Sequence, residues 1–299
     1  MRKLLLAAVT AFAVLVSHQS AQAEAVQIKK DGLALNGNLS LASGKTVKDG
    51  VVLITHGTLA HNGMEVIKAM QAGLAERGFT SLAITLGLGL DNRQGMYDCA
   101  VPHKHKHADS LDEIGAWLGW LKAEGASKVV LMGHSRGGAQ TALFAAERPD
   151  PVVSKVVLLA PMTYDEKAEA ASYQARYGKP LAEPLGKAAV LVKGGKGGEM
   201  MKDTGFIYCP GATASAASFV SYYQPDPRLG VTAPLSKIKA PTLVIAAAND
   251  EVVKGLLEAV KPLADGKKVK LVTVPNADHF FLDLAADDAA DAIKAFLTD

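Results

Sequence analysis

The chain has little cysteine, almost no net charge and no long apolar run beyond its first residues. Two cysteines in 299 residues allow at most one disulfide within the chain. Lys and Arg number 32 and Asp and Glu number 30, so the charge balance gives no indication of a nucleic-acid partner. After residue 23 no segment is both long and charge-free enough to cross a bilayer, so we expect no stable membrane insertion of that part.

The first residues have the layout of a secretory signal peptide. Met1-Arg2-Lys3 is basic, Leu4 to Val16 is apolar, and the small-residue triplet Ala21-Gln22-Ala23 precedes Glu24. The apolar run is shorter than the roughly 20 residues of a membrane-spanning helix, which disfavours the alternative of an uncleaved anchor. We therefore expect residues 1–23 to be removed and residues 24–299 to be periplasmic or secreted.

Both cysteines lie in the part that is expected to be exported. Because compartments outside the cytoplasm are oxidising, one disulfide between Cys99 and Cys209 is the simplest interpretation. Two free buried thiols are the alternative, since a sequence does not show whether two sulfur atoms come within bonding distance.

Short runs rich in valine, leucine and isoleucine alternate with longer stretches of helical period. This alternation is typical of a mostly parallel sheet with helices on both faces, and the length of residues 24–299 fits one large α/β domain. Two early segments, Val26–Lys29 and Leu33–Leu41, flank a turn and predict an antiparallel hairpin at the sheet edge. Six runs are predicted core strands: Val51–Ile54, Ser81–Ile84, Val129–Met132, Val156–Leu159, Leu243–Ala246 and Val269–Val274.

The helices between these strands are predicted from apolar spacing and end signals. Ser110-Leu111-Asp112-Glu113 has the pattern of a capping box that opens one helix, which Gly125 would end. Residues 161–240 break the alternation, and an unstructured loop of that length is improbable in a compact domain, so we interpret them as a cap-like insertion. Further helices are predicted over residues 65–76, 138–147, 252–263 and 284–297.

The strongest chemical motif is Gly133-His134-Ser135-Arg136-Gly137-Gly138, which follows a predicted strand and leads into a predicted helix. A Gly-x-Ser-x-Gly sequence in this context is typical of a nucleophile elbow, where the serine sits in a strained turn with its hydroxyl exposed. The small residues two before and two after the serine let neighbouring backbone pass closely. The motif therefore nominates Ser135 as a nucleophile.

A serine nucleophile needs a base, and the base needs a carboxylate that orients it and stabilises its charged form. His279 is the single histidine of eight that follows Ser135, and in this arrangement the acid and the histidine come after the serine. Asp250 follows the predicted strand at residues 243–246, at the strand end where such sheets place their reactive groups. Three competing carboxylates stay open at this point: Glu251, Asp165 and Asp278.

Acyl transfer also needs N–H donors for the developing oxyanion. The backbone N–H of Arg136 is one candidate. The other is the N–H of Thr58, which lies in His56-Gly57-Thr58-Leu59 after the first core strand. An ordinary glycine turn is the alternative interpretation of this second segment.

Taken together, His56-Gly57, Gly133 to Gly138, Asp250 and His279 resemble the α/β-hydrolase superfamily, over nearly all of residues 24–299. The resemblance implies a sheet of about eight strands and hydrolysis of esters, thioesters, amides or related bonds through an acyl-enzyme, without a cofactor. Two positions depart from the family pattern. Ala247 stands where many relatives have glycine, and Gly87 to Arg93 lacks the Asp-x-Arg-Gly-x-Gly pattern of peptidase-like members, which argues against a peptidase.

His103, His105 and His107 alternate with lysines, and in an extended conformation their rings would share one side. A metal site is conceivable there, but the lysines repel a cation and no cysteine or carboxylate is interleaved. We expect a solvated basic loop near the site entrance, with these histidines as weak metal candidates.

The sequence thus predicts a carboxylic-ester hydrolase that acts on a small-molecule acyl substrate. A thioesterase, amidase or acyltransferase would use the same residues. An alternative from another class is a non-catalytic binding protein on a hydrolase fold, with His103, His105 and His107 as its possible metal ligands.

Overall fold

The computed structural model describes residues 23–299, so residues 1–22 of the predicted signal peptide lie outside the described residues. In this part, no helix is both long enough and apolar enough to cross a membrane.

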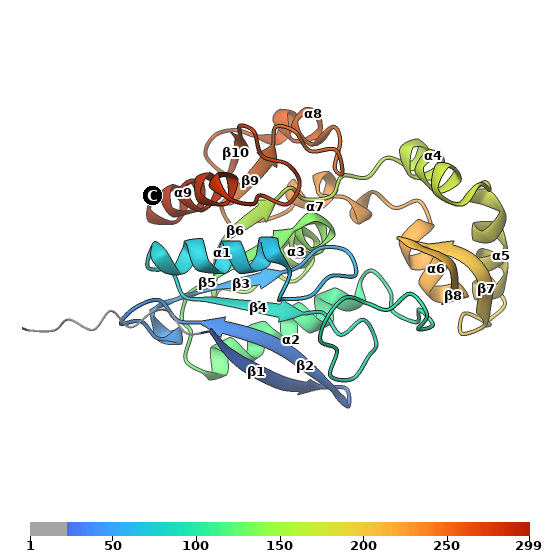
Figure 1. Cartoon of the computed structure of the whole chain (residues 1–299), viewed down its shortest axis with the longest axis horizontal. Helices are drawn as coiled ribbons and strands as arrows, with labels where there is room; N and C mark the ends of the chain where they lie inside the picture. The colour runs from blue at the N-terminus through green and yellow to red at the C-terminus, as the bar shows by residue number, and fades with distance from the viewer. Residues whose placement is uncertain (1–22) are drawn as a thin grey trace, which may run out of the picture.

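An eight-stranded sheet forms the centre of the molecule, in the spatial order β1-β2-β4-β3-β5-β6-β9-β10 (Figure 1). The first hairpin pairs antiparallel with itself and with β4, whereas all later neighbours are parallel. This is the predicted mostly parallel α/β sheet with its antiparallel edge hairpin. The strands are β1 (Ala23–Lys30), β2 (Leu33–Ser40), β3 (Val51–Thr55), β4 (Ser81–Thr85), β5 (Val129–His134), β6 (Val153–Leu159), β9 (Thr242–Ala247) and β10 (Val269–Val274).

Helices cover both faces of this sheet and bury two separate apolar clusters. On one face α1 (Glu65–Glu76) packs against α9 (Leu284–Thr298). On the other face α2 (Asp109–Ala123) packs against α3 (Ser135–Glu147). Alternate residues of the inner strands point to opposite faces, so that strands between two helical layers must be apolar on both sides. This is why the inner strands are continuous apolar runs in the sequence.

Two of the helix predictions are wrong in detail. The Ser110 side chain does not cap α2, which begins at Asp109; its hydroxyl donates to the His107 carbonyl at 2.8 Å. Glu113 is buried instead and accepts a hydrogen bond from the Gly87 N–H at 2.6 Å. The helix predicted over residues 252–263 shortens to α8 (Leu256–Val260) and a 3-10 turn at Lys261–Leu263, because Gly255 has a left-handed φ of 75°, which interrupts a right-handed helix.

Residues 161–240, here called the cap, form a separate lobe beside the sheet (Figure 1). A two-stranded antiparallel hairpin packs there against helices, and a short last helix packs against α3 of the main body. The predicted mixture of helix and extended chain is therefore present. The cap contains α4 (Glu166–Tyr177), α5 (Ala182–Lys193), β7 (Met200–Phe206), β8 (Cys209–Ser215), α6 (Ala216–Tyr223), a 3-10 turn at Pro227–Leu229 and α7 (Thr232–Leu235).

The predicted disulfide between Cys99 and Cys209 is present and joins the cap to the main body. Cys99 lies in the long connection between β4 and α2, and Cys209 is the first residue of β8. The connection also pairs with the cap, because the His103 N–H donates to the Thr213 carbonyl at 2.8 Å and the Ser215 N–H donates to the His103 carbonyl at 2.9 Å. The cap is thus fixed to the body along this line of contact.

Candidate active site

Ser135 occupies the sharp turn where β5 ends and α3 begins. Its φ of 56° lies in the left-handed region, which is strained for a residue other than glycine. Methyl groups at the flanking glycines would not fit, since one at Gly133 would overlap the Gly137 carbonyl and one at Gly137 would overlap the His56 carbonyl. The sequence pattern therefore corresponds to a tightly packed turn that presents the serine side chain beside the loop after β3.

His279 and Asp250 meet at the carboxyl ends of the last two strands of the sheet. The His279 Nδ1 atom lies 2.8 Å from Asp250 Oδ2, and both side chains are almost fully buried. The other carboxylate oxygen accepts the N–H groups of Val252 and Val253 at 2.8 and 2.7 Å. Burial by itself raises the pKa of Asp250, but these hydrogen bonds outweigh it and hold the pKa below its ordinary value. The carboxylate therefore stays ionised next to the imidazole.

The three competing carboxylates have other partners. Glu251 pairs with Lys254 at 2.7 Å on the surface, and Asp165 caps α4 by accepting the Ala168 N–H. Asp278 is exposed and accepts the Phe280 N–H at 2.9 Å. Among the described residues, Asp250 is thus the carboxylate hydrogen-bonded to His279.

Ser135 and His279 line the same cavity but are not hydrogen-bonded to each other among the described contacts. Hydrogen bonds of this kind are often long in a site without substrate and shorten in the complex. The Ser135 hydroxyl and the His279 imidazole thus line one cavity. The imidazole is hydrogen-bonded to the Asp250 carboxylate, whereas no hydrogen bond joins it to the hydroxyl.

The loop after β3 lies against the serine turn. A methyl group added at Gly57 would come within 3.2 Å of the Ser135 Cβ, and Thr58 lines the cavity. Within the described chain the N–H of Thr58 donates to no other residue, and the N–H of Arg136 lies in the first turn of α3, where helix geometry leaves it without a partner. Both N–H groups are therefore available to a bound oxygen.

Buried hydrogen bonds of His56 and Arg93 hold this loop in place. The Leu86 N–H donates to His56 Nε2 at 3.0 Å, and burial lowers the pKa of His56 to about 3. Arg93 donates to the carbonyls of Leu86 and Ala60 at 2.7 and 2.6 Å. His56 is therefore a neutral structural residue. The role of Arg93 had no signal in the sequence.

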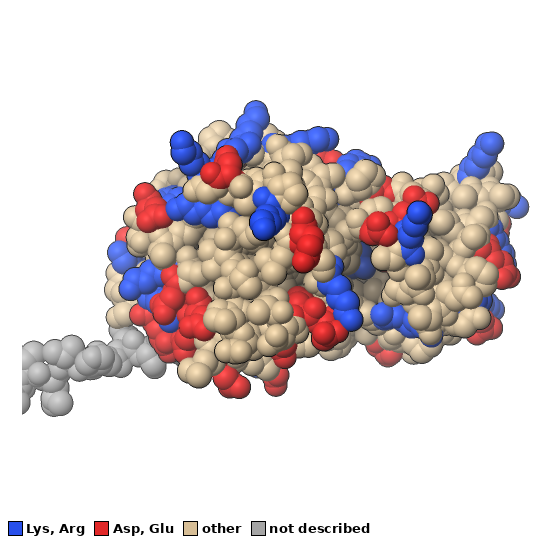
Figure 2. All heavy atoms as spheres, turned by 90° about the horizontal axis from the view of Figure 1, so that it is seen from above, with Lys and Arg blue, Asp and Glu red and all other residues tan. Residues whose placement is uncertain are grey.

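The cavity at Ser135 has a volume of about 820 Å³ and lies between the main body and the cap. Figure 2 shows the surface hollowed between the two lobes, with acidic and basic residues interspersed over this face. Residues of α1, α4, α6 and the loops after β3 and β9 contribute to the wall. Its cap side is rich in tyrosine rings: Tyr173, Tyr177, Tyr208, Tyr222 and Tyr223.

Residues 51–293 match the model of the alpha/beta hydrolase family. The chain belongs to this family. No curated protein is similar enough to match it.

Solved structures of α/β hydrolases share the fold at low sequence identity. Est1E from Butyrivibrio proteoclasticus, solved with ferulic acid, is 21% identical, with a TM-score of 0.63 over 91% of this chain and 98% of its own. The Pyrococcus furiosus esterase PF2001 is 18% identical, with a TM-score of 0.59 over 93% and 91%. E-2-(acetamidomethylene)succinate hydrolase is 20% identical, with a TM-score of 0.59 over 93% and 100%. These likenesses show that the chain shares the overall fold of these structures over most of its length.

His134 is a site residue that sequence reasoning missed in this α/β hydrolase. Its Nε2–H donates to the His279 carbonyl at 2.9 Å, and the two rings lie 4.8 Å apart. Burial lowers the pKa of His134 to about 4, so the ring is neutral at pH 7. His134 therefore holds the backbone of the loop that carries His279. Its place next to Ser135 in the motif was the signal that could have indicated this contact.

The prediction of a solvated loop at His103, His105 and His107 is wrong. All three imidazoles are buried, while the intervening lysines point to solvent. The backbone of this segment pairs with β8, and alternation along an extended chain sends every second side chain inward. Burial lowers the pKa of His103 to about 4 and that of His105 and His107 to about 3.

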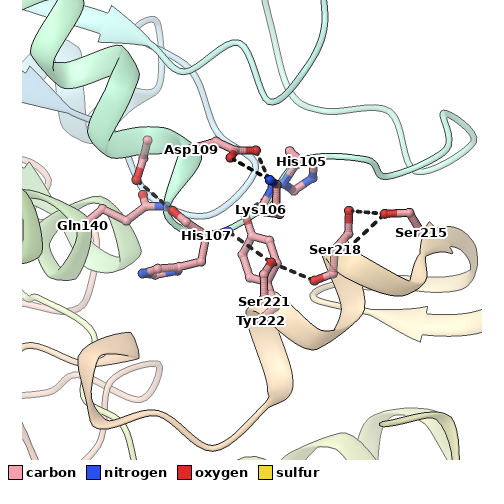
Figure 3. A network of polar contacts seen from close by, with 10 residues as sticks. His105, Lys106, His107, Asp109, Gln140, Ser215, Ser218, Ser221 and Tyr222 are labelled. Carbon is pink, nitrogen blue, oxygen red and sulfur yellow. Dashed lines mark hydrogen bonds and ion pairs between the residues drawn. The ribbon is translucent and has the colours of Figure 1, made fainter. Parts of the chain in front are cut away.

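His105 and His107 lie where the body meets α6 of the cap (Figure 3). His105 Nδ1 lies 2.8 Å from the Tyr222 hydroxyl on α6, and His105 Nε2 lies 3.1 Å from His103 Nδ1. Neither ring nitrogen of His107 has a partner in the described part of the chain. Across residues 23–299, no group of three histidine, cysteine or carboxylate side chains is placed to hold a metal. The three histidines are thus packing residues of the boundary between body and cap.

Proposed function

We propose that this α/β hydrolase is a carboxylic-ester hydrolase that works through an acyl-enzyme on Ser135. In the first step the Ser135 Oγ attacks the ester carbonyl while His279 Nε2 accepts its proton. The carbonyl oxygen becomes an oxyanion and receives hydrogen bonds from the N–H groups of Thr58 and Arg136. His279 then protonates the departing alcohol. In the second half of the reaction His279 accepts a proton from the water that attacks the acyl-enzyme and returns it to the Ser135 oxygen as the carboxylic acid departs.

The observation that carries this proposal is the buried pair of His279 and Asp250, in which the imidazole of His279 lines the same cavity as a serine in a strained turn. The ionised carboxylate fixes the imidazole with the proton on Nδ1, so that Nε2 is free to act as a base. The shared fold of the esterase PF2001 supports the ester as the bond that is cleaved. The apolar tyrosine wall suits an acyl or aromatic group better than a peptide chain.

Labelling with a fluorophosphonate probe, together with hydrolysis of p-nitrophenyl acetate, tests the proposal. The wild type is expected to label and to hydrolyse the ester, and Ser135→Ala is expected to lose both. Ser172→Ala is the matched control, because Ser172 is an exposed serine at the rim of the same cavity, and this variant is expected to label. A folded wild type that neither labels nor hydrolyses the ester would instead indicate a binding protein.

Thioesters and amides are the competing substrate classes for the same residues. Hydrolysis rates for an ester, a thioester and an amide of one acyl group rank the three bonds directly. A greater kcat/KM for the thioester than for the ester, after correction for the uncatalysed rates, would replace the ester in this proposal.

A further inference from the structure

The Arg136 side chain brings an uncompensated positive charge into the cavity. Its Nε atom donates to the Thr58 hydroxyl at 3.1 Å, and its guanidinium carbon lies 5.3 Å from the centre of the Tyr222 ring. These two contacts hold the guanidinium close to the proposed oxyanion donors. Within the described residues no carboxylate lies at ion-pair distance from Arg136, and its remaining N–H groups have no acceptor.

Neighbouring charged residues have partners of their own. At the cavity rim Lys254 pairs with Glu251 at 2.7 Å, and nearby Arg228 pairs with Asp226 at 2.7 Å. Asp165, on the cap side, is occupied as the N-cap of α4. Among the described residues, Arg136 is therefore a cation without a carboxylate partner.

The buried histidines near Arg136 carry no charge. His105 and His107 are neutral at pH 7, because burial lowers the pKa of each and the nearby guanidinium lowers it further. Glu169 borders the same cavity from α4, outside ion-pair distance of Arg136. An anionic ligand would be repelled by Glu169 at the cap side and attracted by Arg136 next to Ser135.

We infer that Arg136 binds an anionic group of the substrate, so that the preferred substrates are esters with a carboxylate a few bonds from the scissile carbonyl. This inference rests on the proposed function. A guanidinium offers a planar pair of N–H donors that matches the two oxygens of a carboxylate. Since Arg136 directly follows Ser135, the anion that it binds must lie near the bond that is cleaved. Arg136 is thus assigned two roles: its side chain determines substrate specificity, and its backbone N–H is a proposed oxyanion donor.

A purely structural role for the Arg136 side chain makes a different prediction. The hydrogen bond to the Thr58 hydroxyl could serve only to position the loop of the second oxyanion donor. Loss of such a positioning contact would slow the hydrolysis of charged and neutral esters by the same factor. The ratio of the two rates therefore separates substrate binding from positioning.

Matched pairs of esters provide this ratio. Monomethyl succinate and methyl 4-methylpentanoate differ by a carboxylate in place of an isopropyl group on the acyl side. The pair of 4-acetoxybenzoate and 4-isopropylphenyl acetate makes the same exchange on the alcohol side. For the wild type, kcat/KM is expected to favour the anionic ester by about tenfold or more in at least one pair, which also identifies the side of the ester that Arg136 contacts.

Arg136→Gln is expected to reduce this preference by about tenfold or more, and Arg136→Lys to retain part of it. Raising the ionic strength is expected to weaken the wild-type preference, because salt screens the charge pair. Arg176→Gln is the matched control: Arg176 also borders the cavity and stacks 4.5 Å over Tyr208, on the cap side. This variant is expected to keep the preference for the anionic ester.

Three results would overturn the inference: no preference for either anionic ester in the wild type, equal losses for both members of a pair in Arg136→Gln, or loss of the preference in Arg176→Gln alone. The neutral esters keep this test distinct from the proposed function. If the wild type hydrolyses the neutral esters and labels at Ser135 but shows no charge preference, the esterase proposal stands and the role of Arg136 fails. If no ester is hydrolysed, both fail.

Discussion

The buried histidine of the proposed site and the three buried histidines between body and cap have different partners. His279 is hydrogen-bonded to the Asp250 carboxylate and faces the cavity. His103, His105 and His107 have no carboxylate partner in the described structure. His103 and His105 are hydrogen-bonded to each other, and His105 is hydrogen-bonded to Tyr222. A buried imidazole can accept a proton at neutral pH only where a negative charge stabilises the cation. The carboxylate, rather than burial or clustering, therefore separates the proposed base from the packing histidines.

The strongest test of this difference is to remove the carboxylate. Asp250→Asn is expected to lower kcat by about 10⁴, since an amide can stabilise neither the correct tautomer nor the charged ring. Steady-state kinetics on p-nitrophenyl acetate measure the loss. Asp278→Asn is the matched control, as Asp278 is the exposed neighbour of His279, and we expect its kcat to stay within about twofold of the wild type. Similar losses in the two variants would contradict the assignment of Asp250.

The contact between body and cap is tested by removing the disulfide. The double variant Cys99→Ser and Cys209→Ser is expected to lower the free energy of unfolding by about 2–5 kcal/mol, because the bond closes a long loop with a sequence separation of 110. Urea unfolding without reductant measures this difference. Wild-type protein in reductant should approach the variant. If the double variant is as stable as the wild type, the histidine and backbone contacts alone are enough to hold the cap against the main body.

Acid should reveal the packing histidines through stability. Their folded pKa values lie near 3 to 4, below the unfolded value of about 6.5, so between these limits the unfolded chain binds protons that the folded chain does not. The free energy of unfolding therefore falls as the pH drops below about 6.5. Removal of one such histidine, as in His107→Leu, is expected to reduce this pH slope by up to about 1.4 kcal/mol per pH unit. Urea unfolding between pH 7 and pH 4.5 measures both slopes.

The smallest effect is expected for His107→Leu at neutral pH. Because both ring nitrogens of His107 are buried without a partner, a leucine is expected to raise the free energy of unfolding by up to about 1 kcal/mol. His105→Leu provides the contrast, since it deprives the Tyr222 hydroxyl of its partner and should lower the stability. Thermal unfolding at pH 7 ranks the three proteins. A destabilised His107→Leu would indicate a contact that the described structure does not contain.

Local patterns account for the parts of this molecule that the sequence predicted well. The inner strands are buried on both faces, so their apolar runs are continuous and easy to recognise. The serine turn needs small residues at two fixed positions, which leaves a readable motif around Ser135. His279 and Asp250 follow from chain order and from their place after strands, although only the structure separates Asp250 from Glu251, Asp165 and Asp278.

The wrong predictions concern segments whose environment comes from distant parts of the chain. Ser110 to Glu113 has the pattern of a capping box, but the Glu113 side chain is buried and accepts a hydrogen bond from the Gly87 N–H. Residues 103–107 carry charged lysines and would be taken for a surface loop, whereas pairing with β8 more than a hundred residues later buries the histidines. Arg93 acts through backbone carbonyls, which every residue has, so the sequence does not indicate its partners.

The bond between Cys99 and Cys209 has a consequence for proteolysis. It closes a covalent ring that contains Ser135, while Asp250 and His279 lie in the chain that follows the ring. A protease that cuts the exposed residues 192–196 would produce two fragments, one with the serine and one with the histidine and the aspartate. The two pieces would stay tethered at high effective concentration until the disulfide is reduced.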